Sequence, residues 1–269
     1  MHPNARLLLL DGPTVQAALD PDAVLAAVQE AFILHSQSAG RVFPLIREKL
    51  HTGGVFGIKA GDVAAQDLLG FKAAGFWPGN RPAGGEPHQA TVLLIDPHTG
   101  RPLCVLDGNA ITTERTGAAG ALGLQRLARA DSARLCVFGT DVQARVQVAY
   151  ALRVLPHLQQ VSYVSRDGQP DAAFESLFSA QCRIGLARDR NEAVAASDVV
   201  ITATPGGGPL FDADAVQAGT HLNCVGADTA GKRELPPGVL ERAQALVVDD
   251  AAQSRTIGEG QWAPPFAGP

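Results

Sequence analysis

The second half of the chain alternates short apolar runs with helical spacing, and this alternation constrains the fold more than any other feature. The apolar runs are Leu135–Phe138, Val161–Val164, Asp198–Thr204, Leu222–Val225 and Ala245–Val248. Strands that alternate with helices pair in parallel, because each helix returns the chain to the same end of the sheet. The sequence therefore predicts a doubly wound, Rossmann-type α/β domain over residues 116–257 that begins with a small-residue helix, Gly117–Leu127.

The first 115 residues have a different pattern. After a short strand at Leu7–Leu10 and a helix that starts at Asp20-Pro21, strand-like runs follow one another with only turns between them. These runs are Arg41–Leu50, Val55–Ile58, Gly70–Trp77, Thr91–Ile95 and Pro102–Leu106. Sequential strands joined by short turns favour a mostly antiparallel sheet. We therefore expect an α+β domain for substrate binding and dimerisation over residues 1–115, and a C-terminal segment over residues 258–269.

Composition argues against several classes of function. The chain has 22 basic and 27 acidic residues, a formal charge of −5 and no run of Lys or Arg, so nucleic acid and anionic membranes are not expected partners. Its 4 cysteines and 7 histidines show no metal-ligand spacing, which predicts free thiols and no metal site. The apolar run near the N-terminus, Leu7–Leu10, is too short for a signal peptide or membrane span, which predicts a cytoplasmic protein.

A candidate phosphate-binding turn lies between the first predicted strand of the α/β domain and the helix Val142–Leu155. It reads Gly139-Thr140-Asp141-Val142-Gln143-Ala144, where a G-x-G-x-x-G/A fingerprint belongs. Gly139 would make the tight turn, and Ala144 would allow the helix to pack closely on the strand. Asp141 replaces the second glycine, and a carboxylate about 4 Å from a phosphate charge costs a few kcal/mol at an effective dielectric near 20. The pattern predicts a dinucleotide site of weakened affinity, with an ordinary strand–helix turn as the alternative.

The end of the second predicted strand carries the residues that would contact the ribose. An acidic residue there binds the 2′-hydroxyl of NAD, whereas a nearby Arg suits the 2′-phosphate of NADP. This chain has Ser165-Arg166, with Asp167 one position later. The arrangement predicts a nicotinamide cofactor, with NADP favoured over NAD. A solvated surface Arg is the alternative.

Two segments resemble the signatures of the ornithine cyclodeaminase/μ-crystallin family. The first runs from Gly85 to Gly120, GEPHQATVLLIDPHTGRPLCVLDGNAITTERTGAAG. The second runs from Asn223 to Leu235 and has the form Asn-x-x-Gly-x-Asp through to Glu-Leu. Gln143-Ala144 and Ile201–Pro205 also match the family. The resemblance implies a homodimeric enzyme that acts on a small amino or imino acid with a tightly held NAD(P).

The resemblance also implies a set of site residues. It assigns the substrate carboxylate to Arg47, Lys72 and Arg115, makes Thr91 a further contact, and makes Asp228 the acid/base group. Lys72, within an apolar run, is a second catalytic candidate, because a buried lysine needs a specific reason. The residues assigned to the cofactor are Thr116, Gly139, Thr140, Asp141, Val142, Gln143, Ser165, Arg166, Thr202, Ala203, Thr204, Val225, Gly226 and Lys232. Taken singly, each cation also fits a solvated surface charge.

Departures from the family keep three functions open. The glutamate that cyclodeaminases carry ahead of the Lys72 strand is absent, and Val55, Phe56 and Gly57 occupy that region. Family members also continue past the region of Gly258-Glu259, so we expect part of their C-terminal segment to be missing. The leading hypothesis is interconversion of a small α-amino acid and its imino or keto acid by hydride transfer, as in ketimine reductases and amino-acid dehydrogenases. The alternatives are ornithine cyclodeaminase and a non-catalytic, μ-crystallin-like protein that binds NADPH or another ligand and keeps the fold with a damaged nucleotide site.

Overall fold

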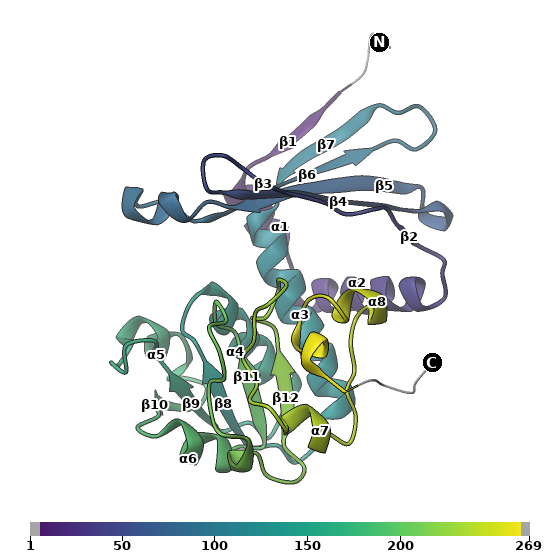
Figure 1. The fold of residues 1–269 in the computed structure, drawn as a ribbon. Helices are drawn as coiled ribbons and strands as arrows, with labels where there is room; N and C mark the ends of the chain where they lie inside the picture. Colours follow the sequence, from purple (N-terminus) through teal and green to yellow (C-terminus); the bar gives the residue numbers. More distant parts are fainter. Residues whose placement is uncertain (1–5, 265–269) are drawn as a thin grey trace. The chain divides into compact units, whose positions relative to one another are not determined.

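The computed structural model describes residues 6–264 (Figure 1), so the last five positions of the predicted segment 258–269 lie outside the described residues. The chain divides into two compact units, Met1–Arg115 (unit 1) and Thr116–Pro269 (unit 2). The division falls within helix α3 (Asn109–Leu127), whose start the sequence pattern placed at Gly117. The helix begins earlier because Asp107 Oδ1 accepts a hydrogen bond from the backbone N of Asn109, at 2.9 Å, and so caps a first turn rich in β-branched residues.

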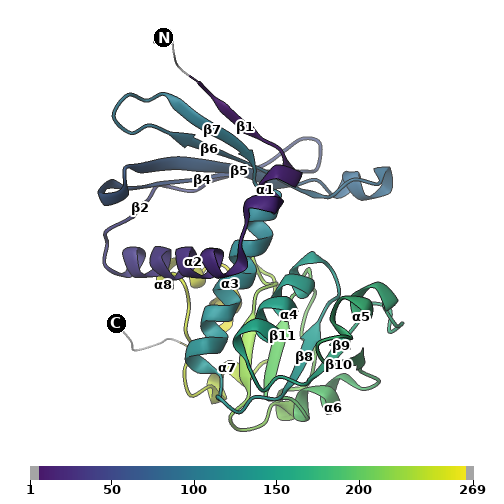
Figure 2. The ribbon, with the colours of Figure 1, turned by 180° about the vertical axis from the view of Figure 1, so that it is seen from behind.

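Unit 1 contains a seven-stranded sheet in the order β1-β7-β6-β5-β4-β2, with β3 also paired to β4 (Figure 2). Its strands are β1 (Leu8–Leu10), β2 (Arg41–Val42), β3 (Ile46–Lys49), β4 (Val55–Val63), β5 (Leu68–Phe76), β6 (His88–Ile95) and β7 (Pro102–Asp107). Among the described strand pairs of unit 1, only β1–β7 is parallel, so the predicted mostly antiparallel sheet is confirmed. The predicted strand Arg41–Leu50 is divided in two around Pro44, whose missing N–H cannot contribute to a strand ladder.

The helices of unit 1 are short, apart from α2. They are α1 (Gly12–Ala18) and α2 (Pro21–Ser36), with the 3-10 turns η1 (Ala64–Gln66) and η2 (Pro78–Ala83). Helix α2 begins where the sequence predicted it: the side chain of Asp20 accepts from the backbone N of Ala23 at 2.9 Å, and Pro21 occupies the first helical position. Both choices suit a helix start, because the first amides have no partner within the helix.

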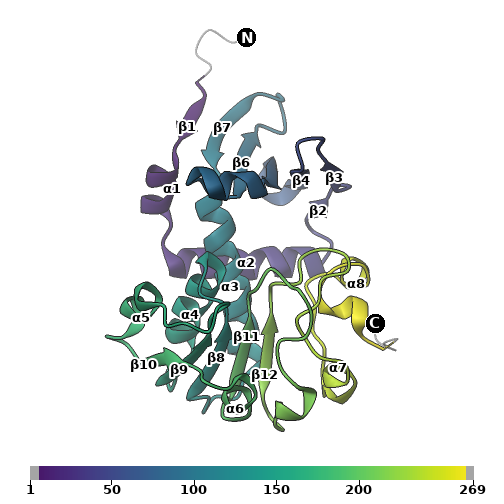
Figure 3. The same cartoon turned by 60° about the vertical axis from the view of Figure 1, so that its left-hand side comes forward.

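Unit 2 contains a five-stranded sheet in the order β10-β9-β8-β11-β12 (Figure 3), and every described pair in it is parallel. Its strands are β8 (Arg134–Phe138), β9 (Gln160–Val164), β10 (Arg183–Leu186), β11 (Val199–Thr202) and β12 (His221–Cys224). Numbered within the unit, this is the 3-2-1-4-5 order of dinucleotide-binding folds. The predicted Rossmann-type architecture is confirmed.

Two details of the predicted sheet were wrong. Residues Ala245–Val248 form no strand, and the side chain of Val247 is 62% exposed. An apolar run by itself does not distinguish a strand from an irregular segment, because the sheet must also offer it a pairing edge. Conversely, the sequence pattern gave no indication of β10, whose four residues include a glycine and an arginine.

Helices cover both faces of the unit 2 sheet. They are α4 (Val142–Val154), α5 (Ala172–Phe178), α6 (Arg190–Ala195), α7 (Val239–Arg242) and α8 (Ala251–Ser254), with η3 (Ala213–Ala215) and η4 (Glu259–Trp262). Leu135 and Val137 of β8 belong to one buried cluster, and Cys136 and Phe138 belong to a second. Since successive side chains of a strand point to opposite faces, the sheet has a core on each side, as a doubly wound fold requires.

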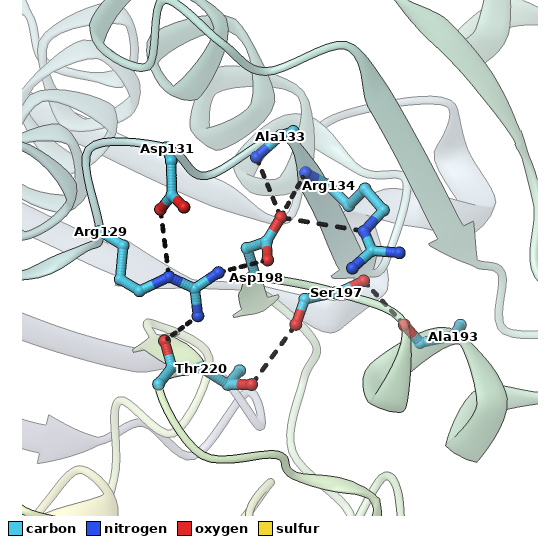
Figure 4. A network of polar contacts seen from close by, with 9 residues as sticks. Arg129, Asp131, Ala133, Arg134, Ala193, Ser197, Asp198 and Thr220 are labelled. Atoms are coloured by element: carbon cyan, nitrogen blue, oxygen red, sulfur yellow. Dashed lines mark hydrogen bonds and ion pairs between the residues drawn. The ribbon is translucent and has the colours of Figure 1, made fainter.

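Asp198 ties together the amino-terminal edge of this sheet (Figure 4). Its carboxylate accepts from the backbone N atoms of Ala133 and Arg134, each at 3.0 Å, and from Arg129 Nη2 at 2.6 Å. Arg129 Nη1 also donates to the carbonyl O of Gly219 at 3.1 Å. Asp198 directly precedes β11, so these hydrogen bonds fix the amino-terminal edge of the sheet. Ligands of open α/β sheets bind at the opposite, carboxyl edge.

The structure adds three observations on classes of site. Within residues 6–264, none of the helices combines the length and apolar character needed to cross a membrane. In the same range no three His, Cys, Asp or Glu side chains gather as candidate metal ligands. All four cysteines are free thiols, with Cys104 and Cys136 buried.

Candidate active site

The turn after β8 has the geometry of a phosphate-binding turn. Gly139 has a φ of +108°, and a Cβ there would lie 2.9 Å from the carbonyl O of Ala203. Only glycine combines this backbone conformation with so close an approach. Ala144 in the first turn of α4 is fully buried, so its small side chain lets the helix pack closely on the sheet. The turn lies at the carboxyl end of β8 next to β11, where the strand order reverses and such sheets bind ligands.

The amino end of α4 is open to an anion. Asp141 is the N-cap residue, but its side chain makes no capping hydrogen bond. The first helical hydrogen bond runs from the backbone N of Arg145 to Asp141 O, so the amides of Val142 and Gln143 have no helical partner. The Oε1 of Gln143 is buried without a hydrogen-bond partner in the described part of the chain. These groups fit a ligand that brings a phosphate and hydrogen-bonding groups, whereas the Asp141 carboxylate opposes an anion.

Thr140, by contrast, is used within the protein. Its side chain forms a hydrogen bond with the carboxylate of Asp171, and its carbonyl O accepts from Arg145 Nε at 2.9 Å. The hydrogen bond of Asp171 with the backbone of Phe174, followed by that with Thr140, holds the pKa of Asp171 below its usual value. Thr140 therefore shapes the turn, and its hydroxyl is already engaged.

The ribose-reading position after β9 leaves an arginine available. Ser165 Oγ donates to the carbonyl O of Gln169 at 2.8 Å, and Asp167 Oδ1 accepts from the backbone N of Gln169 at 3.1 Å. Both side chains therefore stabilise the turn. Arg166 is exposed and, among residues 6–264, has no hydrogen-bond or ion-pair partner. Its guanidinium is free to meet a phosphate.

A fully buried glutamate organises the rest of the carboxyl edge. Glu234 Oε2 accepts from Thr202 Oγ1 at 2.8 Å and from the backbone N of Gly226 at 3.0 Å. Its Oε1 accepts from the backbone N and the Oγ1 of Thr204, at 2.8 and 2.6 Å. Gly226 must be glycine, because a Cβ there would lie 2.4 Å from the carbonyl O of Thr204. Glu234 thus joins the end of β11 to the turn after β12, where Val225 N also donates to Thr202 O at 2.9 Å.

This network limits how two of the predicted cofactor residues could contact a nucleotide. Glu234 engages the hydroxyls of both Thr202 and Thr204, and Thr202 is fully buried, so their assignment to the cofactor stays a prediction that concerns their backbone atoms. Sequence reasoning missed the role of Glu234 because a carboxylate in a polar segment reads as a surface charge. The available signal was its place in the Glu-Leu pair that closes the second family signature.

Asp228 and Lys232, to which the sequence gave separate roles, form an ion pair. Lys232 Nζ lies 2.5 Å from Asp228 Oδ1, and the two side chains are 31% and 64% exposed. The pair follows β12, at the carboxyl edge of the unit 2 sheet. It combines a carboxylate that can exchange a proton with an ammonium that can hold an anion.

In unit 1, the strand register places Arg47 and Lys72 on one face of the sheet. Arg47 pairs with Gly57, Gly57 pairs with Ala74, and Ala74 lies two residues along β5 from Lys72. Side chains of paired residues point to the same face, as do those two positions apart along a strand. Lys59, which pairs with Lys72, therefore lies on this face too. The cations stand beside a row of small side chains, Gly57, Ala74 and Ala90.

Lys72 lies among positive charges. Its Nζ donates to Thr112 Oγ1 of α3 at 3.1 Å. Burial, followed by the charges of Arg115 and Lys59, lowers the pKa of Lys72 to about 8. A bound carboxylate would favour the charged form again. The predicted cations Lys72 and Arg115 therefore act in one electrostatic environment that suits an anion.

His88 is a polar residue of this face that sequence reasoning missed. It pairs with Phe76, four positions along β5 from Lys72, and its Nδ1 lies 3.1 Å from Asn109 Oδ1. Burial lowers the pKa of His88, and the charges of Lys72 and Arg115 lower it further, against the opposing effects of Asn109 and Glu86. The imidazole is therefore mainly neutral at pH 7. The sequence gave no signal beyond the place of His88 in the first signature.

Thr91 does not join Lys72. It pairs with Ala73 on β5 and with Asp107 on β7, so its side chain points to the opposite face of the sheet. There it lines, with residues that include Asp11 and Thr14, a depression of about 450 Å³. Thr91 and Lys72 therefore point to opposite faces of the sheet, and a substrate contact of Thr91 stays a prediction. Side chains at odd and even positions of a strand point to opposite faces of the sheet, and the sequence pattern did not indicate which face carries the site.

The small residues after Arg115-Thr116 serve helix packing. The carbonyl O of Thr116 accepts from Gln147 Nε2 of α4 at 2.8 Å. A Cβ on Gly117 would lie 2.6 Å from side-chain atoms of Val146 and Tyr150, and a Cβ on Gly120 would lie 2.0 Å from Gln147 Oε1. The signature therefore lets α3 approach α4 closely, while Arg115 is exposed in unit 1.

Comparison with known proteins gives a consistent result. The family model described as "Ornithine cyclodeaminase/mu-crystallin family" matches residues 10–265. An iminosuccinate reductase of Paracoccus denitrificans is 31% identical over 261 residues, which cover 96% of this chain and 80% of that protein. An alanine dehydrogenase of Archaeoglobus fulgidus is 32% identical over 254 residues, which cover 94% of this chain and 76% of that protein.

Solved structures of the same kind have a similar fold. An archaeal alanine dehydrogenase dimer with bound NAD superposes with a TM-score of 0.89 at 30% identity, covering 95% of this chain and 78% of that chain. The iminosuccinate reductase of Paracoccus denitrificans in complex with NAD⁺ gives a TM-score of 0.88 at 30% identity, covering 96% and 80%.

Proposed function

The chain belongs to the ornithine cyclodeaminase/mu-crystallin family, and from this premise we propose that it is an NAD(P)-dependent enzyme that interconverts a small α-amino acid and its imino or keto acid. The observation that carries the proposal is the carboxyl edge of the unit 2 sheet. The Gly139 turn follows β8 there, and the Asp228–Lys232 pair follows β12. The two relatives named above are a reductase of an imino acid and a dehydrogenase of an amino acid, which supports this reaction class.

The cofactor is held by groups of unit 2. The tight turn at Gly139 and the open amides of α4 receive the pyrophosphate, and Arg166 reads the 2′ position of the ribose. The bound nicotinamide supplies or accepts the hydride. The two solved neighbours hold NAD, whereas the available Arg166 supports NADP for this chain. If Arg166→Ala weakens the binding of NADPH and leaves the binding of NADH unchanged, this would support NADP as the cofactor. Equal effects on the binding of both would contradict NADP.

The remaining roles follow from charge. Arg47, Lys72 and Arg115 bind the carboxylate of the substrate through charge-assisted hydrogen bonds. Reduction of an imine adds a hydride to its carbon and a proton to its nitrogen. Asp228 gives that proton from its acid form and, in the oxidative direction, takes it back as the carboxylate. Lys232 binds Asp228 between these events.

The structure favours a reductase or dehydrogenase over ornithine cyclodeaminase. The β4 side chains on the Lys72 face are those of Val55, Gly57, Lys59, Gly61 and Val63, and among these described residues none is a carboxylate. Ring closure with loss of ammonia needs additional proton transfer at the second amine. Ammonia release from ornithine with no net change in NADPH would reverse this preference.

A homodimer formed through unit 1 is part of the proposal. Its sheet exposes large apolar side chains, including Leu9 at 69%, Val42 at 74% and Leu103 at 48%. Exposed apolar faces of sheets mark interfaces, and one solved neighbour is a dimer. Sedimentation at micromolar concentration should give the mass of a dimer. A monomer under these conditions would contradict the proposal.

The proposed function is tested by cofactor content and turnover. Mass spectrometry of nucleotide released from the purified protein should detect NAD or NADP. Cyclic imines, and 2-oxo acids with ammonia, should then be reduced at the expense of NADH or NADPH. Gly139→Val is the matched control, because its Cβ would meet the Ala203 carbonyl and no nucleotide should remain. A wild-type protein that neither holds nor binds any nicotinamide nucleotide would overturn the proposal and favour the non-catalytic alternative.

A further inference from the structure

The last described turn of the chain contacts the segment that carries Lys232. We call residues Glu259–Trp262 (η4) the strap; they lie in the yellow end of Figure 1. Gln261 Oε1 accepts from the backbone N of Gly231 at 2.9 Å. Gln261 Nε2 and Trp262 Nε1 both donate to the carbonyl O of Lys232, at 3.2 and 2.9 Å. Side chains of the strap thus hold the backbone of Lys232 and of the residue before it.

The strap also contacts the next two residues. The guanidinium of Arg233 lies 5.1 Å from the centre of the Trp262 ring, a stacking contact that helps orient both groups. Glu259 Oε1 accepts from the backbone N of Glu234 at 2.6 Å, and Glu259 is 6% exposed. Four consecutive residues, from Gly231 to Glu234, are therefore contacted by Glu259, Gln261 and Trp262, which lie 25 to 30 positions later in the sequence.

The segment is fixed at its other end by Glu234. The carboxylate of Glu234 holds the backbone N of Gly226, two residues before Asp228. The stem of Lys232 packs against the turn after β11, where a Cβ on Gly206 would lie 3.3 Å from Lys232 Cβ. Asp228 and Lys232 therefore lie between two points of attachment, one at Gly226 and one at the strap.

The ion pair alone would not set this geometry. Asp228 is 64% exposed, and exposed pairs of this kind contribute little to stability because water and side-chain entropy compete with them. The position of Lys232, and through it that of Asp228, must come from backbone contacts. Those contacts include the three hydrogen bonds that Gln261 and Trp262 make to Gly231 and Lys232, beside the hydrogen bonds from Lys232 N to Thr229 O at 3.2 Å and from Gly208 N to Arg233 O at 3.1 Å.

We propose that Gln261 and Trp262 are positioning residues of the proposed enzyme: they hold the Lys232 backbone so that Lys232 and Asp228 meet the substrate in a reactive geometry. The assignment of the chemistry to Asp228 rests on the proposed function, whereas the attachment of the segment rests on the contacts above. Misplacement of a catalytic group by about 1 Å costs about 10²-fold in rate. A strap that only stabilised the fold would not act through Asp228.

The test is a double variant, Gln261→Met with Trp262→Phe. It removes the three hydrogen bonds, together with the one from Gln261 Nε2 to Gly258 O at 2.8 Å, and keeps side-chain volume and an aromatic ring beside Arg233. We expect kcat to fall about 10-fold or more, with the dissociation constant of the cofactor changed less than about twofold. In an Asp228→Asn background the same change should have little further effect on kcat, because residues that act through one group are not additive. Gln217→Met is the matched control, since Gln217 donates to Ala215 O elsewhere in unit 2.

Two outcomes would overturn the inference. One is that the double variant lowers kcat by the same factor in the Asp228→Asn background as in the wild-type background. The other is a double variant whose amide hydrogen exchange over residues 226–235 is as slow as that of the wild-type protein. We expect faster exchange there in the double variant and wild-type exchange in Gln217→Met. Exchange needs no substrate, so it tests the strap even if the wild-type protein reduces no imine. In that case the proposed function would fail separately.

Discussion

The two units bury their apolar side chains to very different degrees. In unit 2, both faces of the sheet carry closed clusters: Val137 and Tyr163 are fully buried in one, and Val200 is fully buried in the other. In the described part of unit 1, the only buried apolar side chains are those of Val15, Ala90 and Cys104. A parallel sheet is covered by the helices that connect its strands, whereas hairpins leave the faces of an antiparallel sheet open. Unit 2 therefore encloses its own core, and unit 1 depends more on what packs against it.

The units also differ in the charges they offer. Unit 1 places Lys72 in the field of Arg115 and Lys59, which suits an anion. Unit 2 holds carboxylates, with Glu234 buried inside the scaffold and Asp228 at the sheet edge. We infer a division of labour, in which unit 1 binds the substrate carboxylate and unit 2 handles the proton and the cofactor. Four substitutions or conditions test this division, from the largest expected effect to the smallest.

Replacement of the proposed proton carrier in unit 2 should have the largest effect. Asp228→Asn keeps the size of the side chain but removes its charge and its ability to exchange a proton. We expect kcat to fall by about 10²–10⁴-fold with little change in KM. Steady-state kinetics against the best imine checks this. Asp131→Asn, at a side chain that is 81% exposed, is the control and should behave like wild type. Wild-type kcat in Asp228→Asn would remove Asp228 from the mechanism.

A cation of unit 1 should instead affect binding. Arg115→Ala removes a charge-assisted contact to the substrate carboxylate, and a contact of this kind contributes about 1.5–3 kcal/mol, or about 10- to 100-fold in KM. We expect KM to rise by that factor and kcat to change less. Arg101→Ala, in an exposed turn of the same unit, should leave both constants unchanged. If Arg115→Ala lowers kcat at constant KM, the division between the units is wrong.

The charge at the N-cap of α4 should weaken cofactor binding. Asp141→Gly removes a carboxylate next to the proposed pyrophosphate position, and we expect the dissociation constant of NADPH to fall about tenfold at low salt and less at high salt. Fluorescence titration at about 0.01 M and about 1 M ionic strength measures both. Asp141→Asn, which keeps the size of the side chain without its charge, separates electrostatics from the space that the side chain occupies. Equal affinities for all three proteins would place the pyrophosphate away from this turn.

The smallest effect concerns pH. Burial and neighbouring cations lower the pKa of Lys72 to about 8, so its charged form, which binds a carboxylate, is lost as the pH rises through that value. We expect KM to rise several-fold between about pH 7 and pH 9 while kcat follows a separate profile. Lys72→Arg keeps its charge over this range, so its KM should stay flat, although from a different starting value. A wild-type KM that is independent of pH would exclude Lys72 from carboxylate binding.

Some of this protein can be predicted from the sequence because the signals are local. The alternation of strands and helices after residue 134, the capping pair Asp20-Pro21 and the Gly139 turn all depend on adjacent residues, whose periodicity and backbone preferences are properties of the chain itself. The family resemblance added Asp228, Lys72 and Arg115 as candidates, and two of them, Asp228 and Arg115, lie within the two signatures. The same local signals failed at Ala245–Val248, where an apolar run forms no strand and does not pair with the sheet.

The tertiary structure alone decided which side chains meet. The register of β5, β6 and β7 put His88 on the face of Lys72 and turned Thr91 away, because a shift of one residue along a strand reverses the face. Burial turned Glu234 from an apparent surface charge into the partner of Thr202, 32 positions away in the sequence. Gln261 reached Gly231 over a similar separation. Hydrogen bonds between such distant residues depend on how whole elements pack, and no local pattern of residues records that packing.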